Sequence, residues 1–160
     1  MVSTRLKKSI RIAGATSLGI LVILCVINWP RFRDRKLLHA ADSGDTAAVR
    51  LWLRLGGDLK AQLYPGGGTP LMCAARNGHR DTLRVLLDKG ADPNFTENIW
   101  YSTPLIYAVQ SEDPGVVQLL LDRGADPTPA DSYEKTALMY ALEDNNQDIA
   151  DALRHAGAVR

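Results

Sequence analysis

The chain consists of one apolar segment near its beginning and a longer region in which apolar and polar positions follow a helical period. Residues 12–29 contain no charged side chain, and the segments on either side of them are basic. In the longer region, apolar residues recur at spacings of three and four, as Leu83, Leu86 and Leu87 do, which is typical of helices with one buried face. The pattern predicts one long apolar helix followed by several short amphipathic helices.

Two short motifs recur in the same register through the longer region. Thr-Pro-Leu at 69–71 returns at 103–105 and, as Thr-Ala-Leu, at 136–138, so the spacings are 34 and 33 residues. Gly-Ala-Asp-Pro at 90–93 returns at 124–127. A period of this length indicates a repeat architecture, in which each copy buries its apolar face against its neighbours.

Each copy has the signals of two helices and a loop. Thr69 and Pro70 begin the first helix, because the N–H that proline lacks would have no partner in a first turn. Gly78 ends this helix and Gly90 ends the second one, since glycine adopts a positive φ without steric cost. The residues after Gly90 form a loop that leads into the next copy.

These motifs, in this order, resemble the ankyrin repeat. The resemblance implies an all-α solenoid of about four helix-turn-helix repeats, whose expected bounds are 35–67, 68–101, 102–134 and 135–160. The last copy is expected to be a cap, because Arg154 stands where earlier copies have leucine and would face water.

The sequence departs from the family pattern at two kinds of position. The motif histidine is replaced by Met72, Ile106 and Met139, so its usual hydrogen bond between repeats is expected to be absent. Glu112 and Asn145 occupy the glycine position that ends the first helix, and of the two asparagine tolerates a positive φ better. Both departures are expected to lower stability.

The apolar segment 12–29 is expected to be a transmembrane signal-anchor, because 18 helical residues span roughly 27 Å. Residues 1–11 are then a basic tail, residues 30–36 a basic juxtamembrane linker, and residues 37–160 the repeat domain. A cleaved signal peptide and a lipoprotein modified at Cys25 are the alternatives. Neither is favoured, since no small residues stand where cleavage needs them.

The expected location is a single-pass protein of a bacterial inner membrane. The basic residues before the apolar segment favour a cytoplasmic N-terminus and a periplasmic repeat domain, whereas the equally basic flank at 31–36 argues for the reverse. The short chain and the lone signal-anchor are the grounds for a bacterial origin.

The net charge of +1 conceals two regions of opposite sign. Residues 1–36 hold eight basic residues and one acidic residue, a net charge of +7. Residues 37–160 hold 11 basic and 17 acidic residues, a net charge of −6. The basic end suits anionic lipid headgroups, and the acidic region disfavours nucleic acid as a partner.

No arrangement of residues points to catalysis, a metal ion or a cofactor. The histidines, His39, His79 and His155, lack the spacing of a metal site, and His79 is expected to cap the second helix of its repeat. Nothing places a serine, a histidine and an aspartate together. We therefore expect a protein that is not an enzyme and has no cofactor.

Ankyrin stacks bind partners through their loops and through the exposed face of each first helix, and the resemblance carries this over to two sets of residues. The first-helix set comprises Asp42, Ser43, Arg76, Asn77, Gln110, Ser111, Glu143 and Asp144. The loop set comprises Tyr64, Phe95, Trp100, Tyr101 and Tyr133. Exposed Trp and Tyr often dominate interface energetics. The alternative is that Phe95 and Trp100 pack beneath their own loop.

The expected function is that of a membrane-anchored adaptor, monomeric apart from a protein partner that it holds at the membrane surface. The alternative is an immunity or inhibitor protein that neutralises a toxin or a secreted enzyme by binding it. The acidic repeat region would suit a basic toxin.

Overall fold

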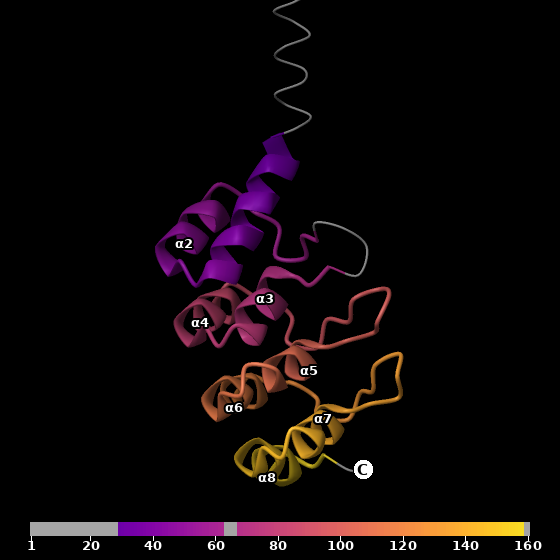
Figure 1. The fold of residues 1–160 in the computed structure, drawn as a ribbon. Coiled ribbons are helices and arrows are strands. Elements are labelled where there is room, and N and C mark those ends of the chain that lie inside the picture. Colours follow the sequence, from indigo (N-terminus) through magenta and orange to yellow (C-terminus); the bar gives the residue numbers. More distant parts are fainter. Residues whose placement is uncertain (1–28, 63–66, 159–160) are drawn as a thin grey trace, which may run out of the picture.

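The computed structural model describes residues 29–62 and 67–158, which form a stack of paired helices (Figure 1). The first helix is described from residue 29 to residue 43. It is followed by α2 (Thr46–Arg54), α3 (Pro70–Arg76), α4 (Arg80–Asp88), α5 (Pro104–Val109), α6 (Pro114–Asp122), α7 (Ala137–Glu143) and α8 (Gln147–His155). The pairs correspond to four repeats, so the predicted all-α repeat solenoid is confirmed.

The two helices of every repeat belong to two different layers. Helix α5 contacts α3 and α7, whereas α4 contacts α2 and α6, and α6 contacts α8. Figure 1 shows α2, α4, α6 and α8 in one column and α3, α5 and α7 in a second, with loops projecting from the far side of the second column. Buried leucine and alanine side chains fill the space between the layers in one continuous core.

The threonine of each motif fixes the start of a first helix. Thr69, Thr103 and Thr136 are the N-caps of α3, α5 and α7. Each hydroxyl accepts a hydrogen bond from the backbone N–H three positions later, at 3.4, 3.3 and 3.3 Å. A cap of this kind stabilises a helix by about 1 kcal/mol.

The ends of the first helices confirm the expected positive φ. Gly44 and Gly78 have φ of 74°, and Glu112 and Asn145 have φ of 55° at the corresponding positions. The left-handed conformation costs a residue with a Cβ about 1–2 kcal/mol, and asparagine less than others. The third repeat therefore stores strain at Glu112.

The motif histidine is absent, but other hydrogen bonds join neighbouring repeats. His79 is the N-cap residue of α4, but its side chain does not cap the helix, so the expected role is wrong. Its Nε2 instead lies 2.9 Å from the backbone oxygen of Asp42 in the first repeat. The hydroxyls of Thr46 and Thr82 are 2.8 Å apart across the same junction.

The N-terminal expectations need correction. No helix within residues 29–62 and 67–158 is long and apolar enough to cross a bilayer, and this finding contradicts the expected single-pass membrane location. Except for Trp29, the proposed anchor at 12–29 lies outside the described residues, as does the tail at 1–11. Residues 30–36, expected to be a linker, are helical. They continue directly into the buried Leu37 of the first repeat, so one helix covers both parts.

Candidate protein-binding surface

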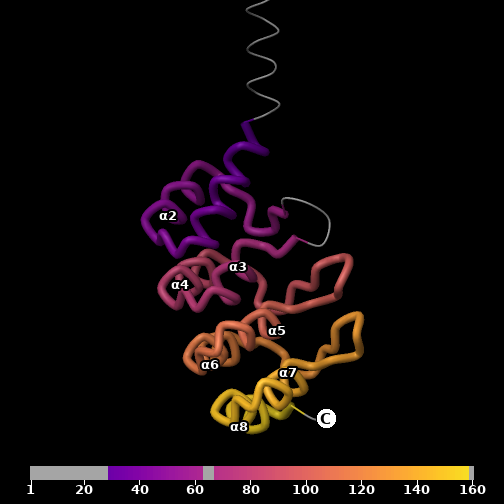
Figure 2. Tube along the Cα trace, in the orientation of Figure 1, coloured from indigo at the N-terminus to yellow at the C-terminus, as the bar shows by residue number. Residues whose placement is uncertain are grey.

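Two loops project from the first-helix layer, and the Cα trace shows them as neighbouring hairpin-like excursions (Figure 2). We call residues 91–103 the Trp100 finger and residues 125–136 the Tyr133 finger. In the Tyr133 finger, Ala130 and Thr136 form an isolated antiparallel bridge.

A buried carboxylate organises the tip of the Trp100 finger. Glu97 is fully buried, and its carboxylate accepts hydrogen bonds from the backbone N–H groups of Ile99, at 2.9 Å, of Trp100, and of Ser102, at 3.5 Å. The backbone N–H of Glu97 in turn donates to the carbonyl oxygen of Ser102 at 3.3 Å. The acid therefore holds the turn that presents Trp100.

Asp131 holds the turn of the Tyr133 finger in the same way. Its carboxylate accepts from the backbone N–H groups of Tyr133 and Lys135, at 2.9 and 3.1 Å, and from the hydroxyl of Tyr140 at 2.6 Å. Burial and the bond to Asp131 raise the pKa of Tyr140, so the phenol stays protonated and donates at neutral pH. The Tyr133 finger is thereby attached to α7.

The two finger tips meet in an exposed group of large side chains, which we call the fingertip cluster: Ile99, Trp100, Tyr101 and Tyr133. The rings of Trp100 and Tyr133 stack with centroids 5.8 Å apart and planes 10° apart. The backbone N–H of Ser132 donates to the carbonyl oxygen of Trp100 at 2.8 Å. The exposed fractions are 45% for Trp100, 58% for Tyr101 and 62% for Tyr133, so about half of this apolar surface faces solvent.

The other aromatic residues of the loop set lie apart from the fingertip cluster. Phe95 is half-buried, and the Lys60 ammonium lies 5.8 Å from the centroid of its ring. Tyr64 lies outside the described residues. Trp100 stacks on the neighbouring finger, so the alternative in which it packs beneath its own loop does not describe it.

The polar residues of the first-helix set are largely bound to other protein groups. Arg76 and Asn77 both donate to one oxygen of Asp42, at 3.1 and 2.9 Å. Glu143 pairs with Lys135 at 2.7 Å. The hydroxyl of Ser111 donates to the carbonyl oxygen of Ala108 at 2.7 Å, and Gln110 and Asp144 are exposed C-cap residues of α5 and α7. This face is charged and already internally paired.

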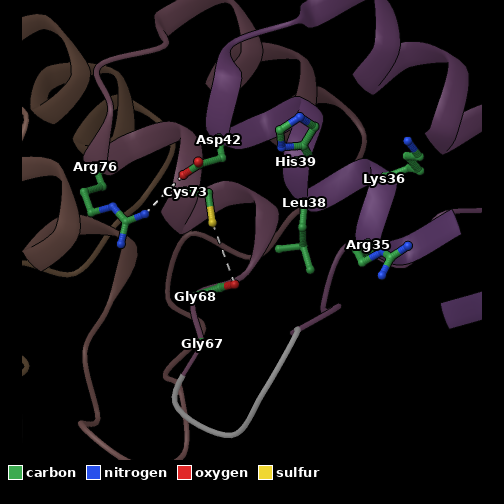
Figure 3. A pocket seen from close by; sticks show the side chains of 9 residues that line it. All are labelled: Arg35, Lys36, Leu38, His39, Asp42, Gly67, Gly68, Cys73 and Arg76. Carbon is green, nitrogen blue, oxygen red and sulfur yellow. Dashed lines mark hydrogen bonds and ion pairs between the residues drawn. The ribbon is translucent and has the colours of Figure 1, made fainter. Parts of the chain in front are cut away.

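A cavity of about 430 Å³ lies where the first and second repeats meet (Figure 3). The first helix contributes Arg35, Lys36, Leu38, His39 and Asp42, the loop before α3 contributes Gly67 and Gly68, and α3 contributes Cys73 and Arg76. Burial raises the pKa of the Cys73 thiol to about 11, so the thiol is uncharged at neutral pH. Among the described residues, no group of three His, Cys, Asp or Glu side chains is placed to hold a metal ion.

Three features of this surface were not predicted from the sequence. Ile99 is exposed beside Trp100, but a single loop isoleucine carries no sequence signal. Glu97 and Asp131 were not singled out, although their spacing of 34 residues matches the repeat and could have revealed them. The cavity was missed because it combines residues from two repeats.

Comparison with known proteins agrees with this architecture. The family model described as ankyrin repeats (3 copies) matches residues 17–97, 37–131 and 92–159. The chain is 37% identical over 78 residues to the human mitochondrial disaggregase, which covers 49% of the chain and 11% of that protein. It is 40% identical over 60 residues to a probable E3 ubiquitin-protein ligase of rice, Oryza sativa subsp. japonica, which covers 37% of the chain and 12% of that protein.

A third relative is the ankyrin repeat, SAM and basic leucine zipper domain-containing protein 1 of Notamacropus eugenii. The two sequences are 35% identical over 66 residues, which is 41% of this chain and 14% of that protein. The chain therefore spans only between 11% and 14% of the length of these three relatives. What these relatives do as whole proteins is not transferred by such a match.

Proposed function

Because the chain belongs to the ankyrin repeat family, we propose that it is a non-catalytic protein-interaction module whose fingertip cluster anchors a protein partner. Repeat solenoids of this kind present extended surfaces to their partners. The proposal rests on one observation above all, the stack of Trp100 on Tyr133 across two separate fingers in an exposed position.

Three properties of the fingertip cluster support this role. Trp and Tyr bring large contact area with few rotatable bonds, and they are the residue types enriched among interface hot spots. The backbone of each tip is held by a buried acid, Glu97 or Asp131, so little ordering cost remains for binding. Arg76, Asn77 and Glu143 on the neighbouring helix face are already paired within the protein, whereas the side chains of the fingertip cluster expose large apolar surface.

The proposal is tested by affinity capture with the full chain and two double variants. Trp100→Ala with Tyr133→Ala removes the stack, and Leu51→Ala with Leu55→Ala removes two exposed leucines from the opposite layer as a control. We expect a specific partner to be captured by the wild type and by the leucine variant and to be lost with the aromatic variant. Equal capture by all three proteins would contradict the proposal.

An inhibitor form of the same function is favoured by the charge of the chain. Residues 37–160 carry a net charge of −6, and Glu112, Asp144 and Asp148 line one cavity near the C-terminal end. A basic enzyme or toxin would complement this end. If the captured partner is such a protein, its activity should fall in proportion to the amount of complex. Unchanged activity would exclude the inhibitor function and would be consistent with the adaptor function.

A further inference from the structure

The cavity between the first two repeats carries a local positive charge on an otherwise acidic repeat region. Arg35, Lys36 and Arg76 line it against the single carboxylate of Asp42. Figure 3 shows the Arg76 guanidinium and the Asp42 carboxylate joined directly, so these two charges compensate one another.

The two remaining cations have no acidic partner among the described residues. Lys36 places its ammonium 5.6 Å from the centroid of the Phe32 ring, an interaction that leaves its charge available to an anion. Arg35 forms no ion pair within residues 29–62 and 67–158. The cavity therefore has a surplus of two positive charges. Cys73, at its inner side, adds no negative charge at neutral pH because burial raises its pKa.

The shape of the region fits an extended peptide better than a small ion. Arg35 and Leu38 also line an adjoining cavity of about 780 Å³. The second cavity adds two cations, Arg31 and Lys60, and two carboxylates, Asp34 and Asp58, so the surplus of two positive charges holds for both cavities together. A peptide would offer carboxylates to the cations and methylene groups to Leu38 and could extend through both cavities, whereas an inorganic ion offers only the charge.

We infer that this paired cavity binds an acidic peptide segment, with carboxylate side chains on Arg35 and Lys36. This inference rests on the proposed interaction function and identifies a second part of the same partner surface. A partner that presents an apolar patch to the fingertip cluster would present Asp or Glu residues to the first repeat.

The direct test is a titration of the full chain against a fluorescent hexaglutamate peptide blocked at both ends, with the matching hexaglutamine peptide as reference. The variant Arg35→Gln with Lys36→Gln removes the surplus charge. The matched variant Arg50→Gln with Arg54→Gln removes two exposed arginines of α2 outside the cavity. We expect the first variant to weaken hexaglutamate binding at least about fivefold and the second to change it less than about twofold.

Three results would overturn the inference. Binding of hexaglutamine as tightly as hexaglutamate would show that the charge of the peptide is not recognised. An equal loss of hexaglutamate affinity in both variants would show that binding depends on the net charge of the chain and not on the cavity. Binding of inorganic phosphate without binding of hexaglutamate would indicate a small-anion site instead. Circular dichroism of each variant confirms that the fold is retained, since all four substituted residues are exposed.

The same titration separates this inference from the proposed function. The variant Trp100→Ala with Tyr133→Ala should bind hexaglutamate like the wild type, because neither residue lines either cavity. If the fingertip cluster proves irrelevant to partner capture, hexaglutamate binding still decides whether the cavity is an acidic-peptide site. If hexaglutamate does not bind, partner capture through the fingertip cluster is unaffected.

Discussion

The helices and the fingers of this protein are held in place by different interactions. In the helical layers, the second, third and fourth repeats each bury one leucine completely at the corresponding position, namely Leu86, Leu120 and Leu153, and the core around them is largely apolar. In the fingers, the buried groups that define the backbone are the carboxylates of Glu97 and Asp131. The helices are thus stabilised by burial of apolar area, and the finger tips by hydrogen bonds to a charged group.

The two regions also differ in what they expose. The helix face presents paired charges such as Arg76 with Asp42, whereas the fingers present the stacked rings of Trp100 and Tyr133. Stability and binding are therefore assigned to different residues. Substitutions that affect one region without the other test this separation.

The largest effect is expected from a core leucine. Leu86→Ala should destabilise the protein by about 2–5 kcal/mol, because it leaves a cavity in the fully buried layer between repeats. Chemical denaturation followed by circular dichroism measures this loss. Leu51→Ala, at a residue that is 50% exposed on α2, is the control and should change the free energy of unfolding by less than about 0.5 kcal/mol.

A smaller and more local effect is expected from the acid of the Trp100 finger. Glu97→Ala leaves three backbone N–H groups without their acceptor, at a cost of about 1–3 kcal/mol. Hydrogen exchange should accelerate at Ile99, Trp100 and Ser102 while the amides of α4 and α6 keep their protection. Uniform acceleration throughout the chain would show instead that the finger and the helices unfold as one unit.

A stabilising effect is expected at the strained end of α5. Glu112→Gly should raise the free energy of unfolding by about 0.5–1 kcal/mol, since glycine relieves the positive φ but gains entropy in the unfolded chain. Asn145→Gly, at the same position of the next repeat, should gain less because asparagine tolerates this conformation. A loss of stability in Glu112→Gly, measured by thermal unfolding, would contradict the assignment of strain.

The smallest effect is expected from an ion pair between the second and third repeats. The hydrogen bond from Arg80 holds the pKa of Asp113 below its ordinary value of 3.8. The stabilisation from this pair is therefore present above the ordinary pKa and is lost as the pH falls through the lowered one. Asp113→Asn retains an acceptor for the cap of α6, so unfolding measured from about pH 5 to pH 2.5 should show a shallower decline than in the wild type. An identical decline would rule out a contribution from the pair.

The sequence was sufficient to predict the helices because their signals are local and repeated. The threonine caps and the positive φ at Glu112 both follow from comparing one copy with the next. The fingers were harder to predict, because an acid in a loop is usually solvated, and nothing local shows that Glu97 is buried. The stack of Trp100 on Tyr133 depends on the distance between two fingers, which only the packed structure supplies.

The N-terminal expectations were less successful for a similar reason. Basic residues at 30–36 indicated a linker, but a helix accepts exposed arginines along one face while its other face leads into the core at Leu37. The membrane location was inferred from the apolar length of residues 12–29, their basic flanks and the missing cleavage site, and no described helix is long and apolar enough to cross a bilayer.

The central claim is that the fingers bind while the helices stabilise. The most direct test measures, in one variant, Trp100→Ala with Tyr133→Ala, both the affinity for the captured partner by calorimetry and the free energy of unfolding. We predict a loss of at least about 2 kcal/mol in binding and a loss of no more than about 1.5 kcal/mol in unfolding, the contribution of one aromatic pair. An unfolding loss as large as that of Leu86→Ala, or unchanged affinity in a folded variant, would contradict the claim.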